Sequence, residues 1–123
     1  MKQNIDCIRD ILLTVEKDVP LDGHIDLKNL TLPNSYDRDD IVYSLKLLKE
    51  ANYLNVTLTG ASNTYYLVWI GNMTYDGHQF LDSIRNANVW QSTKDKIANF
   101  GSDLSLSLIS QVAMSVIKSQ LNL

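Results

Sequence analysis

The residues best suited to acid–base chemistry are His78 and its neighbours Asp76 and Asp82. A histidine that is oriented by a carboxylate can act as a general base. A catalytic site needs further groups, and the chain has only one other histidine, His24, with no glycine-rich phosphate loop and no serine elbow. Its one cysteine, Cys7, falls on an expected core helix. We therefore expect no enzymatic activity, no catalytic residues and no cofactor.

A structural role is the alternative for the segment around His78. Thr74 can cap a helix, because its side-chain oxygen accepts hydrogen bonds from first-turn amides. Gly77 allows this helix to approach the preceding segment closely, and the imidazole of His78 is expected to bond a nearby backbone carbonyl. Phe80 and Trp90 are expected to pack in the core. We interpret these five residues as a structural motif.

Size and charge set the class of protein. The chain has 123 residues, 45% of them hydrophobic and 20% charged, which is typical of one ordinary globular domain. Eleven Lys and Arg stand against fourteen Asp and Glu, so the formal charge is -3. This balance repels polyanions.

Cysteine usage and hydropathy favour a cytoplasmic protein. With Cys7 alone, no internal disulfide can form, and no paired spacing typical of a metal site occurs. Acidic and basic residues interrupt the first apolar stretch, so we expect no signal or transit peptide. The longest strongly apolar run, 65–70, is far shorter than the roughly 20 residues that cross a bilayer. We expect no membrane contact.

Periodicity predicts a winged-helix-like order of elements. Apolar residues at spacings of three and four predict the first helix, and alternation predicts the strands. Ser35 or Asp37 can cap the second long helix. The expected elements are a helix over 5–15, a short strand near 25–27, a shortened or missing helix within 30–36, a helix from 38 to 51, a hairpin over 54–70 with its turn at 60–63, one bent or two separate helices from 74 to Gly101, and a closing helix.

We therefore predict an α+β fold, a winged-helix-like domain with additional C-terminal helices. The chain forms a single domain, 1–123, with a winged-helix-like core over about 1–87 and a helical extension over about 88–123.

Four segments resemble the family called domain of unknown function 2513. They are IDCIRDILLTVE, IVYSLKLLKEANYL, MTYDGHQFLDSIRNANVW and LISQVAMSVIKSQLNL. The resemblance implies a small winged-helix-like protein of bacteriophages, prophages and their bacterial hosts. It implies no activity and no catalytic residues.

Exposed aromatic residues on the second long helix and the hairpin favour a protein partner. Tyrosine and tryptophan concentrate at interface hot spots. The alternative is that Tyr65, Leu67 and Trp69 pack beneath the helices. The candidate interaction surface consists of Asp39, Tyr43, Lys46, Glu50, Tyr65, Tyr66 and Trp69.

The alternative function is a DNA-binding transcriptional regulator that uses the helix at 38–51 and the hairpin at 54–70. DNA is held mainly through phosphates neutralised by Lys and Arg. The reading helix offers Lys46 and Lys49 against four acidic residues, and no Lys or Arg occurs from 50 to 84. Charge therefore favours protein over DNA as the partner.

The last helix leaves the oligomeric state open. Leu121 and Leu123 are expected to be exposed, which suits a homodimer, and a monomer fits equally well. In a dimer, scattered cations could gather into a basic strip, namely Lys17, Lys28, Lys94 and Lys96.

Overall fold

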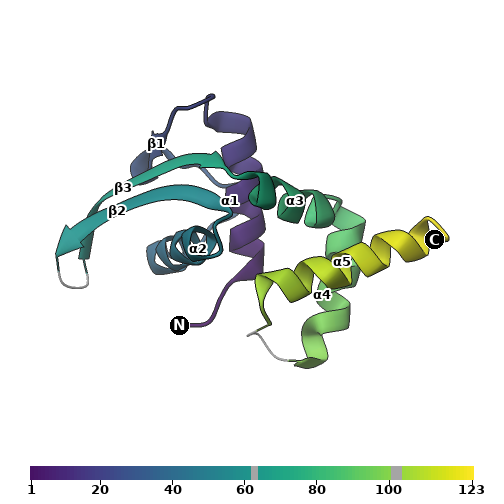
Figure 1. Ribbon diagram of the computed structural model, residues 1–123. Helices are drawn as coiled ribbons and strands as arrows, with labels where there is room; N and C mark the ends of the chain where they lie inside the picture. Colours follow the sequence, from purple (N-terminus) through teal and green to yellow (C-terminus); the bar gives the residue numbers. More distant parts are fainter. Residues whose placement is uncertain (62–63, 101–103) are drawn as a thin grey trace.

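A computed structural model describes residues 1–61, 64–100 and 104–123 of the chain. Its elements follow the predicted winged-helix-like order (Figure 1). They are α1 (Ile5–Asp18), β1 (Ile25–Asp26), the 3-10 helix η1 (Leu27–Asn29), α2 (Arg38–Glu50), β2 (Leu54–Ala61), β3 (Thr64–Met73), α3 (Tyr75–Ile84), α4 (Ala87–Ile97), the 3-10 helix η2 (Ala98–Phe100) and α5 (Leu106–Gln120).

The sheet has three antiparallel strands in the order β1-β3-β2. The β2–β3 hairpin arches over α1 and α2 (Figure 1). Side chains alternate across the sheet, so Val56, Val68 and Ile70 are buried toward the helices. The predicted hairpin is confirmed, with β3 continuing to Met73. Part of its predicted turn lies outside the described residues.

One hydrophobic cluster joins the helices to the inner face of the sheet. Its members come from every long element, because each contributes one apolar stripe or face. The largest fully buried side chains in it are Ile8, Ile11, Leu12, Leu45, Leu48, Ile70, Leu81, Ile84 and Ile109. Ser44 on α2 is also fully buried, which the apolar spacing does not predict.

Helix starts follow the capping rules in most cases. Asn4 caps α1 by accepting from the amide of Cys7 at 3.1 Å, and Thr74 caps α3 as predicted. Helix α2 differs: Asp37 is the N-cap residue, but its side chain makes no capping hydrogen bond. Ser35 lies outside the helix. The prediction of a side-chain cap is therefore wrong, and the helix begins with Asp39 and Asp40 in its first turn.

The C-terminal helices are attached to α1 by polar contacts. The indole Nε1 of Trp90 on α4 donates to Oδ1 of Asp6 at 2.8 Å, and Nζ of Lys94 lies 3.1 Å from the same oxygen. Trp90 is itself only 5% exposed. Arg9 donates to the carbonyls of Ile84 and Arg85 at 2.9 and 2.6 Å, where α3 ends. The predicted packing role of Trp90 is confirmed.

The structural motif around His78 is confirmed except at the histidine. The Thr74 hydroxyl oxygen accepts from the amide of Gly77 at 3.0 Å. Phe80 is buried and stacks on Tyr53 with ring centroids 5.0 Å apart. His78 is exposed, and its imidazole forms no hydrogen bond with the described residues, so the expected bond to a carbonyl is wrong. The helix turns that side chain to solvent.

Two separate helices, α3 and α4, occupy the stretch after Thr74, and a closing helix, α5, follows. The predicted stop at Gly101 lies outside the described residues. Within the described residues, no helix is both long and apolar enough to cross a membrane.

Candidate functional site

The edge of β3 that faces β1 is paired over only two residues. Ile25 and Asp26 of β1 are opposite Ile70 and Trp69, and the chain then turns away into η1. In the described chain, residues 65–68 of β3 therefore have β2 on one side and no strand on the other. Unpaired amide and carbonyl groups at a sheet edge can pair with a strand from another chain.

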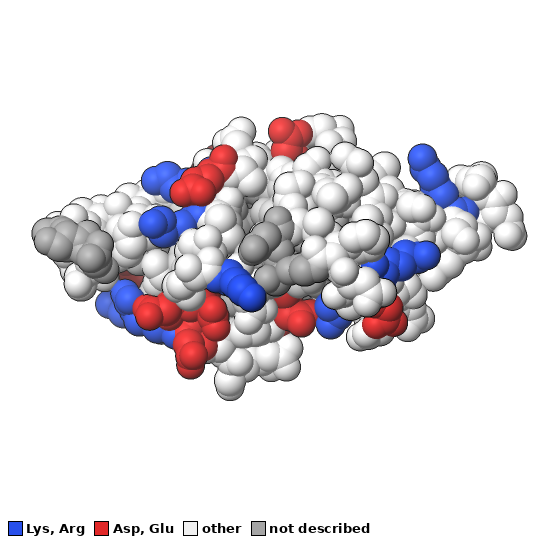
Figure 2. Space-filling view, turned by 90° about the horizontal axis from the view of Figure 1, so that it is seen from below, with Lys and Arg blue, Asp and Glu red and all other residues white. Residues whose placement is uncertain are grey.

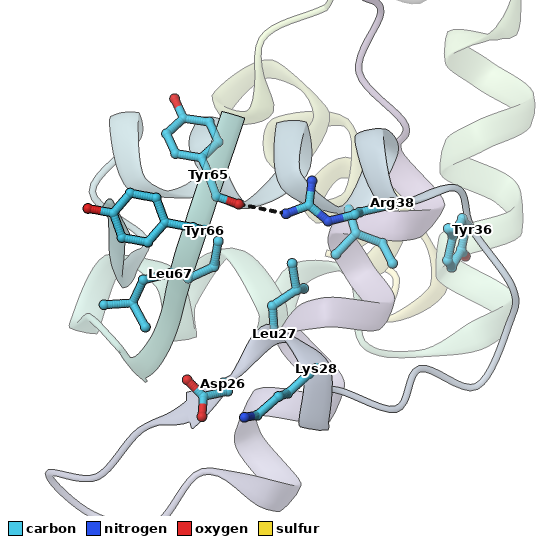
Figure 3. Close-up of a pocket in the computed structure, with 10 residues that line it drawn as sticks. Asp26, Leu27, Lys28, Tyr36, Arg38, Tyr65, Tyr66 and Leu67 are labelled. Carbon is cyan, nitrogen blue, oxygen red and sulfur yellow. Dashed lines mark hydrogen bonds between the residues drawn. The ribbon is translucent and has the colours of Figure 1, made fainter. Parts of the chain in front are cut away.

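A groove of about 470 Å³ lies beside this open edge. We call it the edge groove. Figure 3 shows Tyr65, Tyr66 and Leu67 along β3 on one side and Arg38 and Tyr36 on the other. Its lining residues are Asp26, Leu27, Lys28, Tyr36, Arg38, Ile41, Tyr65, Tyr66, Leu67 and Val68.

Apolar side chains line part of the edge groove, and their exposure to solvent differs widely. Val68 is 4% exposed, while Leu27 and Ile41 are half-buried against the core. Tyr66 is 75% exposed. The register between β2 and β3 shifts between Thr59 and Gly60, so Tyr66 is the extra residue of a β-bulge. The bulge changes the alternation of side chains at this end of β3.

Arg38 is the cation directed at the open edge. Its Nη2 donates to the carbonyl oxygen of Tyr65 at 3.0 Å in an exposed position (Figure 3). On the same helix, Nζ of Lys46 lies 5.8 Å from the centre of the Tyr65 ring, a cation–π distance. Helix α2 thus contacts both the carbonyl and the ring of Tyr65 on β3.

A buried carboxyl group holds the far wall of the edge groove. Oδ2 of Asp10, on α1, accepts from the Tyr36 hydroxyl at 2.7 Å and from Nδ2 of Asn34 at 2.9 Å. Burial, followed by the hydrogen bond to Asp10, raises the pKa of Tyr36 well above 10.0. Tyr36 is therefore a neutral donor at physiological pH, and it ties the loop before α2 to α1.

The structure brings together part of the predicted interaction surface. Tyr65 and Tyr66 line the edge groove, and Lys46 borders it through the Tyr65 ring. Asp39 and Glu50 are exposed on α2 and Tyr43 is half-buried, and none of these three lines the groove.

Trp69 is 39% exposed and does not line the edge groove. It stacks on His24 with centroids 4.3 Å apart. Core packing beneath the helices is thus wrong for Trp69, whereas Tyr65 is half-buried against the core.

The sequence patterns miss Arg38 and Tyr36 as site residues. Arg38 also adds a cation to the first turn of α2, beside its acidic residues. In the sequence, the position of Arg38 directly before the apolar pattern of the helix indicates a site role only weakly. The short pairing of β1 with β3 leaves the edge open. No pattern of residues in the sequence predicts this short pairing.

Charges are mixed on the surface that a DNA-binding winged helix would use. Figure 2 shows basic and acidic residues beside each other and wide uncharged areas on the face seen from below. No continuous basic band crosses the described part of this face. Of the four cations that a basic strip would need, Lys94 is paired with Asp6.

A second groove, of about 610 Å³, lies between α3 and α5, with Phe80, Met114 and Ile117 among its lining residues. As predicted, Leu121 and Leu123 are exposed, at 61% and 86%. A homodimer through α5 stays a prediction. The described residues contain no group of three or more His, Cys, Asp and Glu that could hold a metal ion.

Fold and groove together define an α+β winged-helix-like protein with an open sheet edge. The chain belongs to the family described as hypothetical protein (DUF2513), whose model matches residues 2–103. It is similar to an uncharacterized protein of Haemophilus influenzae (strain ATCC 51907 / DSM 11121 / KW20 / Rd), with 36% identity over 121 residues, which is 98% of this chain and 99% of the relative. No solved structure matches the chain. The resemblance to this family is confirmed.

Proposed function

We propose that this protein is a non-enzymatic protein-interaction module that uses the edge groove to hold a segment of its partner. The observation that carries this proposal is the edge of β3 at 65–68, which has no strand partner within the described residues and lies beside half-buried apolar side chains and an exposed tyrosine. Open edges, aromatic rings and arginine are features that protein partners use. We place the module in the cytoplasm, in a phage-related setting.

The residues suited to chemistry support a non-enzymatic role. His78 is exposed, and Asp82 pairs with Arg85 at 2.8 Å. Cys7 is fully buried, and this burial raises the pKa of its thiol, so the reactive thiolate is disfavoured. These groups are distributed over the molecule and do not converge on the edge groove.

Selection from an unbiased library of linear peptides tests the proposed function. We expect peptides that bind wild-type protein and lose at least about tenfold in affinity for a Tyr66→Ala variant, because a tyrosine in an interface is a typical hot spot. Affinity is measured by fluorescence anisotropy. Tyr66 is 75% exposed, so the substitution should leave the fold intact.

Tyr75→Ala is the matched control, since Tyr75 is 76% exposed and lies on α3, outside the edge groove. Its affinity for the peptides should equal that of wild type. Peptides equally sensitive to both substitutions, or a selection that yields no binders, would contradict the proposal.

DNA binding is the second candidate, because the winged-helix-like order of elements favours it. Few cations on this surface are available to bind phosphates. Arg38 donates to the Tyr65 carbonyl, and Lys46 lies over the Tyr65 ring. We expect no complex with duplex DNA in a mobility-shift assay at physiological salt. Tight binding that weakens steeply as salt is raised would instead show phosphate contacts, and Lys46→Gln would then reduce it.

A further inference from the structure

We infer that the edge groove binds an extended peptide segment that adds to β3 as an antiparallel strand and places an acidic side chain beside Arg38. This inference rests on the proposed function and names the partner's conformation and charge. An added strand gains main-chain hydrogen bonds from the edge and specificity from side-chain pockets.

We infer the direction of the added strand by analogy with β1. This strand runs antiparallel to β3 on the same edge, with Ile25 opposite Ile70 and Asp26 opposite Trp69. A segment in line with β1 would meet Val68 next and would end near Tyr65. Its alternate side chains would enter the space that Leu27 and Ile41 line.

Charge separates the two ends of the edge groove. Asp26 and Lys28 lie at the end next to β1, where their charges offset each other. Arg38 lies at the other end and donates to the Tyr65 carbonyl (Figure 3). An acidic residue therefore fits toward the C-terminal end of the added strand.

Arg38 also protects the edge when no segment is bound. Its hydrogen bond to the Tyr65 carbonyl is exposed, so an amide of the incoming strand can replace it. The guanidinium can then turn its fork of donors toward a carboxylate, and a bidentate pair with a carboxylate is stronger than one bond to a neutral carbonyl. The exchange links strand addition to recognition of the acidic side chain.

The test uses one peptide from the library selection, chosen because Tyr66→Ala weakens it. We expect alternating apolar residues followed by Asp or Glu. Replacing that acid by its amide should lower affinity about tenfold, as loss of a charge-assisted hydrogen bond does. Arg38→Gln should lower it equally, and the two changes together should add no further loss. Lys49→Gln, on the same helix but outside the edge groove, is the control and should have no effect.

Backbone pairing is tested by N-methylating each peptide amide in turn. Alternate amides should be sensitive, because only every second amide of a strand faces its neighbour. A peptide that depends on Tyr66 but shows neither this alternation nor acid dependence would overturn the inference and leave the proposed function standing. Peptides that do not depend on Tyr66 would overturn both.

Discussion

We expect the Gly77→Ala substitution to lower the free energy of unfolding by about 3 kcal/mol, which is in the upper part of the range for overpacking. A Cβ atom at Gly77 would lie 2.0 Å from the carbonyl oxygen of Tyr53. That oxygen also accepts from the amide of Thr74 at 3.0 Å, so it cannot withdraw without breaking the start of α3. Urea unfolding followed by circular dichroism measures the change.

This loss of stability is opposite in sign to the usual effect of the substitution, because alanine in a helix interior is normally more stable than glycine by about 1 kcal/mol. Gly71→Ala is the control: its Cβ would lie 3.3 Å from both the Cβ and the backbone carbonyl oxygen of Asn55, contacts that a shift of a few tenths of an ångström relieves. We expect a change within about 1 kcal/mol for Gly71→Ala, typical of minor repacking. A stable Gly77→Ala variant would contradict the close approach of α3 to Tyr53.

Gly77 is also a residue whose role the sequence makes visible. A glycine shortly after a capping threonine indicates either a tight approach or a weak helix, and the apolar spacing that follows it excludes the weak helix. The order of elements was predictable for the same reason: local periodicity and turn residues indicate α1, α2 and the hairpin, and each signal reflects neighbouring residues alone.

The edge groove depends on contacts between distant parts of the chain. It exists because β1 leaves β3 after Asp26 and because Tyr36 is tied to Asp10, across 26 positions. Neither contact is indicated by a periodic pattern or a motif in the sequence. Tyr65 and Tyr66 were predictable as candidate interaction residues by their type, whereas Arg38 becomes a site residue only through its contact with the Tyr65 carbonyl.

His78 and Trp69 are placed by the packing of whole elements and not by their residue type. Spacing indicates which residues share a helix face, but His78 turned out to face solvent. Trp69 is large and apolar, yet its strand position directs it to the uncovered face of the sheet, where His24 stacks on it. Which face of a sheet is covered depends on where the helices pack.

The second large effect is expected at Asp10, which is 5% exposed on α1. Asp10→Ala should lower the free energy of unfolding by about 2–3 kcal/mol, because the half-buried Tyr36 hydroxyl loses its acceptor and the Asn34 amide must turn to water. Asp18→Ala, an exposed change near the end of the same helix, should shift stability by less than about 0.5 kcal/mol.

A double-mutant cycle locates this effect in the wall of the edge groove. Tyr36→Phe alone should lower the free energy of unfolding by about 1 kcal/mol, the net value of one hydrogen bond. Combined with Asp10→Ala it should add much less, because the two groups form one contact. Asp10 does not line the groove, yet Asp10→Ala should also weaken peptide binding, since the Tyr36 wall is no longer held. Additive stability losses with unchanged peptide affinity would show that the loop before α2 keeps its place without Asp10.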